Sequence, residues 1–446
     1  MSFKVAFHTL GCKVNYYESE ALKGEFRRAG FEVVDFEEPA DVYVINTCTV
    51  THLAERKSRQ IIRRAKRRNP AALVAVTGCY AQVSPEDISS LGQADLVTGT
   101  ADRLALPELV RKKMAGGDVF AGIDAYAKEA VFEDLPWVSE GERTRAFLKI
   151  QDGCRQFCTY CIIPRARGPL RSLPLQKALA YLQEIGRSGY KEVVLTGIHL
   201  GLYGIDLQPQ TDLGSFLERA AAVEGIERLR LSSVEPWDLE DKLLEVIKGN
   251  KKICRHLHIP LQSGDDGILK EMGRPYDTSF YRGLLKRLRD ALPDLAVSTD
   301  IMVGFPGESE EQFRRGIDFV RECAFSRLHV FKYSPRSGTK AASMADQVRP
   351  EIKEARSREM INLGKELARN FQEKFIGRRL DVLFEKVLPA GDERGEIAAG
   401  GLLEGLTSNY LRVRAPGPGN LRGQIREVLI KKNAGDYLIG VRLHNE

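Results

Sequence analysis

The chain has 446 residues, with 67 Lys and Arg against 61 Asp and Glu, a formal charge of +6, and 43% of its residues are hydrophobic. This composition excludes wholesale disorder and low-complexity classes, and the length predicts two to four globular domains. No apolar run approaches about 18 residues and no secretory signal pattern opens the chain, so we expect a cytoplasmic protein without a membrane segment. The mild basic excess allows a nucleic-acid partner without requiring one.

Three stretches near the start share one outline, an apolar or β-branched run that ends at a cysteine. They are VAFHTLGC, VYVINTC and LVAVTGC, and they end at Cys12, Cys48 and Cys79. Helical patterns separate them, one ending at Gly30 and the next before Pro70, so residues 1–125 are predicted to form an open parallel α/β domain. Because parallel strands end at one edge of a sheet, we expect the three cysteines to meet there.

A second alternation of strands and helices is predicted over residues 143–375, after a polar linker over residues 126–142. Polar residues follow the ends of its strands, where barrel enzymes place their active sites. Six strand–helix units are too few for a complete eight-fold barrel, so the pattern predicts a partial (βα)6 barrel. The candidate strands are AFLKIQ, EVVLTG, RLRLSS, HLHIPLQ, VSTDIMVG and RLHVFKYS.

Short strands broken by glycine mark the last part of the chain, residues 376–446. Four stretches carry this pattern: LDVLFEKVL, GLLEGLTSNYLRVRA, GQIREVLIKKN and DYLIGVRL. They predict a small all-β barrel. The predicted fold class is therefore α/β, with an open parallel domain, a central partial barrel and a terminal β module.

The strongest local signal is the run Cys154, Cys158 and Cys161, directly after the first barrel strand. Three thiolates at this spacing can hold an iron–sulfur cube whose fourth iron has no protein ligand. The motif resembles the radical S-adenosylmethionine superfamily, in which the free iron binds that cofactor, and Tyr160 fits its aromatic position. The resemblance implies cofactor contacts at Thr196, Gly197, Ser233, Gln262 and Gly304.

Two structural alternatives accompany the six cysteines. The barrel run could instead form a structural zinc site completed by His256 or His258, although zinc knuckles normally pair C-x₂₋₄-C with H-x₃₋₅-H. The N-terminal cysteines could be ordinary buried core residues, but three equivalent positions at strand ends argue against coincidence. Cys254 and Cys323 lack such partners and are expected to be buried small hydrophobes.

Together, the two cysteine trios and the β module resemble the methylthiotransferase family. The resemblance spans the chain, and TLGCKVNYYESE, INTCTVTHLAERKSRQ, QDGCRQFCTYCIIPRARGP, LTGIHLGLYG and HIPLQSG are most similar to its branch acting on threonylcarbamoyl-adenosine in tRNA. The isopentenyl-adenosine branch typically has GCQMN around the first cysteine and the ribosomal-protein branch GCPKN, whereas this chain has GCKVN. The family implies an auxiliary cluster on the first trio, a radical barrel and a TRAM module for RNA.

What this family implies is insertion of a methylthio group at C2 of the modified adenosine beside the anticodon. Its cofactors would be two [4Fe-4S] clusters and two molecules of S-adenosylmethionine, one to methylate a sulfur on the auxiliary cluster and one to generate the radical. Expected partners are the tRNA anticodon stem-loop, a sulfur donor and a one-electron reductant such as flavodoxin or ferredoxin, with the chain acting as a monomer. The alternatives are the isopentenyl-adenosine enzyme, the ribosomal-protein enzyme that modifies an aspartate, and a non-catalytic zinc- or cluster-stabilised RNA-binding protein.

Two segments are candidates for RNA contact. Arg56, Arg59, Arg63 and Arg67 recur along one stripe of a predicted helix, opposite a small buried stripe of Ala54, Ser58, Ile61 and Ala65. Eight of the thirteen residues from Arg56 to Arg68 are basic, which favours phosphate contact, although an exposed helix kept soluble by charge has the same pattern. Residues 406–414 place Tyr410 and Arg412 on an expected strand suited to base stacking, a pattern also found in protein-binding barrels.

Overall fold

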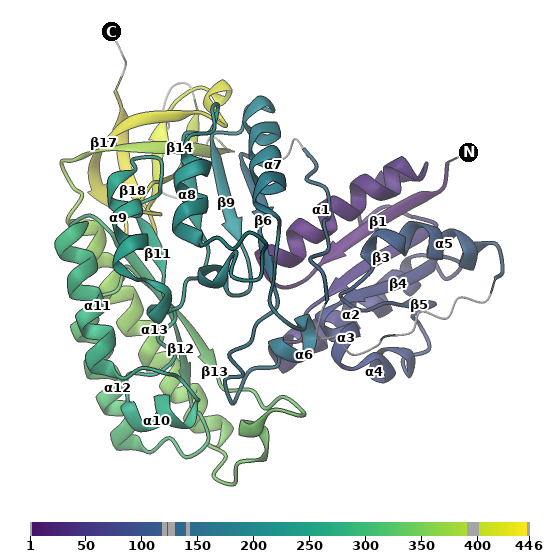
Figure 1. Cartoon of the computed structure of the whole chain (residues 1–446), viewed down its shortest axis with the longest axis horizontal. Helices are drawn as coiled ribbons and strands as arrows, with labels where there is room; N and C mark the ends of the chain where they lie inside the picture. The colour runs from purple at the N-terminus through teal and green to yellow at the C-terminus, as the bar shows by residue number, and fades with distance from the viewer. Residues whose placement is uncertain (1, 118–122, 124–129, 140–142, 390–400, 444–446) are drawn as a thin grey trace.

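A computed structural model describes residues 2–117, 123, 130–139, 143–389 and 401–443 of the chain (Figure 1). The predicted fold class is confirmed: a parallel sheet, a partial barrel and a small closed barrel follow one another along the chain. Within the described ranges, no helix is long and apolar enough to cross a membrane.

The N-terminal unit is a five-stranded parallel sheet in the order β2-β1-β3-β4-β5. The apolar residues of its strands alternate between two cores, so helices cover both faces: α1 and α5 pack on one face, and α2, α3 and α4 on the other. The strands are β1 Lys4–Thr9, β2 Glu32–Val34, β3 Val42–Thr47, β4 Leu73–Gly78 and β5 Leu96–Val97. The helices are α1 Lys13–Arg28, α2 His52–Arg68, α3 Cys79–Val83, α4 Pro85–Ser89 and α5 Leu106–Met114, with a 3-10 turn η1 at Arg103–Ala105.

The central unit contains the six predicted parallel strands. They form two ladders, β6-β9-β10 and β11-β12-β13, which isolated bridges join at Leu229–Ile253 and Ser233–His258. Among the described residues no ladder joins β6 to β13, so the barrel is open on that side. The strands are β6 Arg145–Lys149, β9 Glu192–Thr196, β10 Arg228–Leu231, β11 His256–His258, β12 Ala296–Val303 and β13 Arg327–Lys332.

Helices cover the outside of this barrel and contribute to the largest apolar core of the described chain. The helices are α7 Leu175–Arg187, α8 Leu213–Ala221, α9 Asp241–Gly249, α10 Asp266–Glu271, α11 Thr278–Ala291, α12 Glu310–Cys323 and α13 Pro350–Glu373, with 3-10 turns η2 Leu200–Leu202, η3 Pro236–Asp238 and η4 Lys340–Ser343. A pair of antiparallel strands of two residues each, which the sequence pattern did not predict, follows β6. The loop between these strands contains a short helix. These elements are β7 Gln151–Asp152, α6 Ile163–Arg167 and β8 Arg171–Ser172.

The C-terminal unit is a closed barrel in the order β14-β15-β16-β18-β17. The prediction of one strand through residues 406–414 was wrong, because β15 ends at Thr407 and β16 begins at Arg412. Tyr410 lies in the turn between them with φ +66°, a left-handed conformation that a strand does not accommodate. The strands are β14 Arg379–Leu388, β15 Leu402–Thr407, β16 Arg412–Pro416, β17 Ile425–Asn433 and β18 Leu438–Arg442, with a 3-10 turn η5 at Gly419–Leu421.

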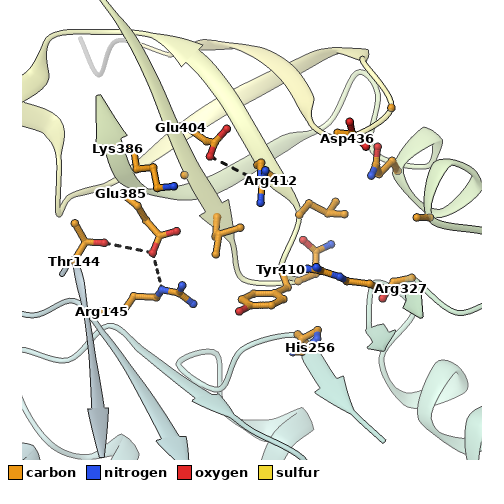
Figure 2. Close-up of a pocket in the computed structure, with 18 of the residues that line it drawn as sticks. Thr144, Arg145, His256, Arg327, Glu385, Lys386, Glu404, Tyr410, Arg412 and Asp436 are labelled. Carbon is orange, nitrogen blue, oxygen red and sulfur yellow. Dashed lines mark hydrogen bonds and ion pairs between the residues drawn. The ribbon is translucent and has the colours of Figure 1, made fainter. Parts of the chain in front are cut away.

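The C-terminal barrel packs on the N-terminal ends of the central strands. Arg228 donates to the carbonyl oxygen of Asp381 at 2.7 Å, and Arg230 donates to that of Thr407 at 3.0 Å. Arg145 donates to Glu385 at 2.6 Å, as Figure 2 shows. The barrel therefore covers one end of the central unit and leaves the other end, where the strands finish, to the N-terminal sheet.

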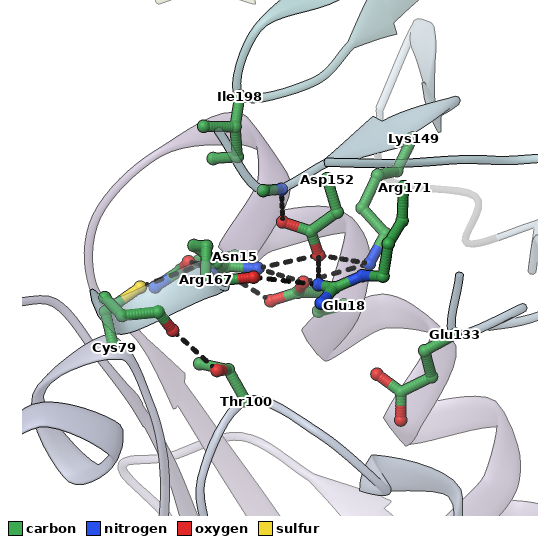
Figure 3. Close-up of polar contacts among 12 residues, drawn as sticks. Asn15, Glu18, Cys79, Thr100, Glu133, Lys149, Asp152, Arg167, Arg171 and Ile198 are labelled. Atoms are coloured by element: carbon green, nitrogen blue, oxygen red, sulfur yellow. Dashed lines mark hydrogen bonds and ion pairs between the residues drawn. The ribbon is translucent and has the colours of Figure 1, made fainter. Parts of the chain in front are cut away.

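A buried ionic network joins the N-terminal sheet to the central barrel (Figure 3). Glu18 on α1 accepts a hydrogen bond from Lys149 at 3.1 Å, lies 3.3 Å from Arg103, and is also paired with Arg167. Burial alone would raise the pKa of Glu18, but Arg103, Arg167 and Lys149 outweigh it and lower the value to about 2. The carboxylate is thus ionised and held by cations from both units, which fixes their relative position.

The segment predicted as a linker, residues 126–142, lies partly outside the described residues, which include 130–139. Leu135 accepts a hydrogen bond from the Tyr17 hydroxyl at 2.7 Å, and the Trp137 ring meets Tyr190 edge-on with centroids 5.8 Å apart. Both Leu135 and Trp137 belong to the main core, so this part of the segment is a packed connection between the first two units.

Candidate active site

The first cysteine trio lies at one edge of the N-terminal sheet, as predicted. Cys12 precedes α1, Cys48 follows β3, and Cys79 begins α3 directly after β4, and β1, β3 and β4 are neighbours in the sheet. Gly11 has φ +107°, and a Cβ there would lie 3.0 Å from the Cβ of Cys48, so the turn before Cys12 needs glycine. The three cysteines therefore follow neighbouring strands at the same edge of the sheet.

Polar groups from both units surround this first trio. Arg167 donates from Nε to the sulfur of Cys79 at 3.2 Å, and the Cys12 sulfur lies 3.8 Å from the amide oxygen of Asn15. Burial raises the pKa of Cys79 to about 12 although Arg167 opposes the shift, and burial also raises the pKa of Cys48. A buried thiol of this kind becomes a thiolate when it binds a metal, which releases its proton.

The second trio lies on the loop between β7 and α6, at the C-terminal ends of the barrel strands. This loop folds back tightly: Gly153 has φ +74°, and a Cβ there would lie 1.8 Å from the carbonyl oxygen of Pro169. The sulfur of Cys154 lies 3.6 Å from Nδ1 of His199, and Arg274 donates to the sulfur of Cys158 at 3.3 Å. Burial raises the pKa of Cys161 to about 12.

His199 connects Cys154 to Asp238. Its Nε2 lies 2.8 Å from an Asp238 oxygen, while Nδ1 faces the sulfur. Burial would lower the pKa of His199, but the hydrogen bonds to Asp238 and Cys154 raise it to about 9. An imidazolium therefore lies between two groups that are anionic when the thiol is a metal ligand, an arrangement typical of residues that orient ligands and tune a centre.

The two trios meet at helix α6. This helix starts two residues after Cys161 and ends at Arg167, which contacts Cys79. Thr100, which follows β5, donates to the carbonyl oxygen of Ala166 at 2.7 Å and holds the helix against the N-terminal sheet (Figure 3). Two sets of three thiols, each from a different unit, thus flank one short segment.

The distances among the cysteine sulfurs test whether a trio could bind a single zinc ion. In the described residues, one set of three His, Cys, Asp or Glu ligand atoms lies within 4.8 Å of one another, and it is His258, Asp300 and His329. Four ligands at about 2.3 Å around one zinc ion would bring sulfurs to roughly 4 Å. Neither trio is that compact, so the sulfurs as placed do not form a single-zinc site. All eight cysteines are free thiols, and three thiols are the donor set of an iron–sulfur cube with one open iron.

The two histidines named for the zinc alternative have another partner. His256 and His258 each lie 2.9 Å from the hydroxyl of Ser298, on the barrel wall. The imidazole beside the barrel trio is that of His199, which the sequence analysis did not single out. Arg167 and Arg274 were also missed, although His199 lies in LTGIHLGLYG and Arg167 in QDGCRQFCTYCIIPRARGP, two segments that carried the resemblance. Cys254 and Cys323 are buried, as predicted.

The residues predicted to contact S-adenosylmethionine lie at the strand ends around the cysteine loop. Thr196 ends β9 and Gly197 packs on Gln151, which accepts from the amides of Ile198 and His199 at 2.8 and 2.7 Å. Ser233 forms an isolated β-bridge with His258, and Gln262 forms one with Ile301. The φ of Gln262 is +70°. Tyr160 packs beside the small core that contains Met272, Phe305 and Tyr333.

Gly304 has a local role that the sequence pattern did not indicate. Its amide donates to Glu308 at 2.7 Å, and a Cβ there would lie 2.4 Å from Cγ of Lys353. With φ +71°, the residue makes a turn that only glycine accommodates at this packing. Its cofactor contact therefore stays a prediction that rests on the resemblance.

Comparison with known proteins decides the family. Residues 4–99 match the model of Uncharacterized protein family UPF0004, and residues 148–320 match the Radical SAM superfamily. The chain is 44% identical to the threonylcarbamoyladenosine tRNA methylthiotransferase MtaB of Bacillus subtilis (strain 168), over 97% of this chain and 95% of the relative. The chain is a radical SAM methylthiotransferase.

Other similarities agree with this assignment. The methylthiotransferase is 36% identical to the ribosomal protein uS12 methylthiotransferase RimO of Lachnoclostridium phytofermentans (strain ATCC 700394 / DSM 18823 / ISDg), over 86% of this chain and 87% of that one. Its fold is similar to that of TsrM from Kitasatospora setae, a radical S-adenosylmethionine methyltransferase structure, with a TM-score of 0.56, 16% identity and coverage of 75% and 77%. The predicted cofactors, [4Fe-4S] clusters and S-adenosylmethionine, are those of the family.

The arginine stripe of the methylthiotransferase is exposed only in part. Arg56, Arg63 and Arg67 are exposed on α2, whereas Arg59 donates to the hydroxyl of Tyr80 at 2.8 Å. The buried stripe is shifted from the prediction, because α2 buries Glu55, Ser58, Ile62 and Ala65 and leaves Ala54 and Ile61 half-buried.

Tyr410 lies between the C-terminal barrel and the central one (Figure 2). Its ring lies 4.6 Å from that of His256 and beneath the guanidinium of Arg230 at 4.5 Å. It borders a cavity of about 940 Å³ at the open side of the central barrel, between β6 and β13. Basic side chains dominate the described lining: Arg143, Arg145, Arg327, Lys365, Arg369, Lys386, Arg412 and Arg422, against Glu385, Glu404 and Asp436.

Proposed function

We propose that this methylthiotransferase inserts a methylthio group at C2 of threonylcarbamoyl-adenosine beside the anticodon of tRNA, using two molecules of S-adenosylmethionine. The observation that carries the proposal is the pair of cysteine trios flanking α6, one from each unit. The printed activity of the Bacillus subtilis relative, which matches nearly the whole chain, supports the substrate. The site is expected to work in the cytoplasm.

Cys12, Cys48 and Cys79 would hold the auxiliary cluster, and Cys154, Cys158 and Cys161 the radical cluster. When bound, the two clusters supply the electron that cleaves S-adenosylmethionine and the sulfur that is transferred. The chain's own residues prepare the ligands: Arg167 and Arg274 favour the thiolate forms of Cys79 and Cys158, and His199 orients Cys154. Tyr160, Thr196, Gly197, Ser233, Gln262 and Gly304 are proposed to contact the cofactor.

Exclusion of water is the other task of the protein, because a carbon radical reacts with whatever it meets. The buried network around Glu18 and Asp152 closes the N-terminal sheet against the barrel mouth. A reductant of the flavodoxin or ferredoxin class and a sulfur donor are required from outside the chain. We propose the boundaries 1–125, 143–375 and 376–446 for the three units and a monomeric enzyme.

We place the RNA on two basic surfaces. Arg56, Arg63 and Arg67 offer exposed charge on α2, with Arg59 beside them held by Tyr80. The basic cavity between β6 and β13 would receive phosphates of the anticodon stem-loop, with Arg412 on its wall and Tyr410 at its inner end.

Nucleoside analysis tests the substrate. In a strain whose copy of this gene is disrupted, tRNA should accumulate threonylcarbamoyl-adenosine without its methylthio group, and the intact gene should restore it. The Cys12→Ala and Cys154→Ala genes should not restore it, and the Cys323→Ala gene, which changes a cysteine outside both trios, should. If the disrupted strain instead lacks the methylthio group on isopentenyl-adenosine or on the ribosomal aspartate, the proposal is contradicted, and that molecule is the substrate.

A further inference from the structure

Three side chains that can bind a metal meet on the wall of the central barrel. Each of its last three strands contributes one: His258 ends β11, Asp300 lies on β12 and His329 lies on β13. One ligand atom from each residue lies within 4.8 Å of the other two, and this is the one such set of His, Cys, Asp and Glu in the described part of the chain. The proposed reaction gives these residues no task.

The spacing of the three ligand atoms fits one coordinated ion. Nε2 of His258 and Nδ1 of His329 each lie 3.2 Å from the same oxygen, Oδ1 of Asp300. Two atoms bound to one ion at about 2.0–2.2 Å lie roughly 3 Å apart when their angle is octahedral or tetrahedral. One ion can therefore contact all three atoms with little movement of the barrel wall.

The other nitrogen of His258 has the kind of partner that metal-binding imidazoles have. Its Nδ1 lies 2.9 Å from the hydroxyl of Ser298, which leaves Nε2 directed at Asp300. Such a hydrogen bond fixes the orientation of a metal-binding ring. The rings of His258 and His329 are stacked with centroids 5.2 Å apart. Two imidazolium rings at this separation would repel each other, whereas a metal ion binds both rings in the neutral form.

The three side chains face the interior of the barrel. Side chains two residues apart on a strand share a face, and His256 and Arg327, two residues before His258 and His329, line the basic cavity between β6 and β13. The ligand set therefore lies about 6–7 Å further along the strands, toward their C-terminal ends. It is open to solvent, because 40% of the His329 side chain and 25% of the Asp300 side chain are exposed.

We propose that His258, Asp300 and His329 bind one divalent first-row transition-metal ion inside the barrel. Two imidazoles and one carboxylate suit such ions, and three protein ligands leave positions for water or for an oxygen atom of an incoming ligand. The backbone amide of Gln262, a residue proposed to contact S-adenosylmethionine, donates to the carbonyl oxygen of Asp300 at 2.8 Å. The ion would lie beside that region and would belong to neither cluster. The inference holds whichever substrate is modified.

Mn²⁺ is the probe, because it prefers nitrogen and oxygen ligands to the thiolates that hold the clusters. Holoenzyme with oxidised clusters would be treated with a chelator to remove loosely bound metal and then titrated with Mn²⁺. The paramagnetic resonance signal of the free aqueous ion gives the bound fraction. We expect one ion per chain, and pulsed measurements should detect imidazole nitrogens coupled to it. Iron and sulfide content before and after the titration shows whether the clusters are intact.

Variants assign the ion to these ligands. His329→Ala and Asp300→Asn should each weaken Mn²⁺ binding at least about 100-fold, and Ser298→Ala, which removes the hydroxyl that orients His258, about 10-fold. His256→Gln is the matched control, because this imidazole lies on the same wall and lies 2.9 Å from the same hydroxyl, and it should bind Mn²⁺ as the wild type does. His329 is the most exposed of the three ligands, so its replacement disturbs the core least.

Three results would overturn the inference. If wild-type holoenzyme with full iron content binds no Mn²⁺ up to about 1 mM, the three side chains form hydrogen bonds only. If binding persists in His329→Ala and Asp300→Asn, or if the bound ion shows no nitrogen coupling, the ion lies elsewhere. If His256→Gln loses binding as fully as His329→Ala, the loss reflects the barrel wall as a whole and not these three ligands.

Discussion

Individual buried charges decide how the active site is assembled. Glu18 is fully buried, and the cations around it come from η1, β6 and α6. A single carboxylate therefore pairs with positive charges from three different elements. Arg167 uses the same guanidinium to reach Glu18 and the sulfur of Cys79. The same network therefore holds the two units together and contacts Cys79, a proposed cluster ligand.

Replacing Glu18 tests this network. Glu18→Gln should lower the free energy of unfolding by about 3–5 kcal/mol, because it leaves buried cations without their anion. Urea denaturation of the apoprotein measures the change. Glu20→Gln, which removes only a partly exposed pair with Lys23, should cost less than about 1 kcal/mol, and equal losses in the two variants would contradict the network's role.

His199 should tune the radical cluster rather than ligate it. Removing a hydrogen bond to a ligating sulfur makes a cluster harder to reduce, so His199→Ala should shift the midpoint potential to more negative values. Redox titration of the paramagnetic signal that responds to S-adenosylmethionine measures the shift. Asp238→Asn should cause a smaller shift in the same direction, and an unchanged potential in both variants would remove the assignment.

At the scale of the element, the pattern of apolar runs predicted the strands of the central unit and the first two long helices, α1 and α2. The three strands that precede the cysteines were correct because each is a short β-branched or apolar run; β3 and β4 are buried along their whole length, and β1 is buried only in part. The β7–β8 hairpin was missed because two-residue strands have no periodicity, and the turn at Tyr410 was missed because its left-handed backbone has no signal in a β-rich run. Contacts across units, such as those of Arg167, Arg274 and His199, depend on packing that no local pattern contains.

The exposed face of α2 should contribute to RNA affinity. Changing Arg56, Arg63 and Arg67 together to Glu should weaken binding of the anticodon stem-loop at least about 10-fold and reduce the slope of log K against log salt by about 2 to 3. Binding titrations at several salt concentrations measure both. Arg64→Gln with Arg68→Gln is the control, because those side chains pair with Glu37, and a similar slope change there would contradict a specific role for the exposed stripe.

At the scale of the whole molecule, the C-terminal barrel covers one end of the radical SAM unit. Phe371 and Phe375, at the end of α13 and just beyond it, belong to the core of the C-terminal barrel, as does Ala296 of β12. Deleting residues 376–446 would expose Phe371, Phe375 and Ala296 as well as remove the proposed RNA module. A substitution in the contact is therefore more informative than a deletion.

Tyr410 is the residue for this test. Tyr410→Ala should lower the free energy of unfolding by about 2–4 kcal/mol, because the ring packs on His256 and lies beneath Arg230. Urea denaturation and limited proteolysis near residue 376 measure the loss of docking. Unchanged stability with weakened RNA binding would contradict the docking role and restore the prediction that Tyr410 stacks on a base.

The proposed function depends on two clusters, each held by one cysteine trio. Iron and sulfide analysis of anaerobically reconstituted protein should give about eight of each per chain, and about four when Cys12, Cys48 and Cys79 or Cys154, Cys158 and Cys161 are replaced by Ala. Stoichiometric zinc, or eight iron atoms that persist after either trio is removed, would contradict it.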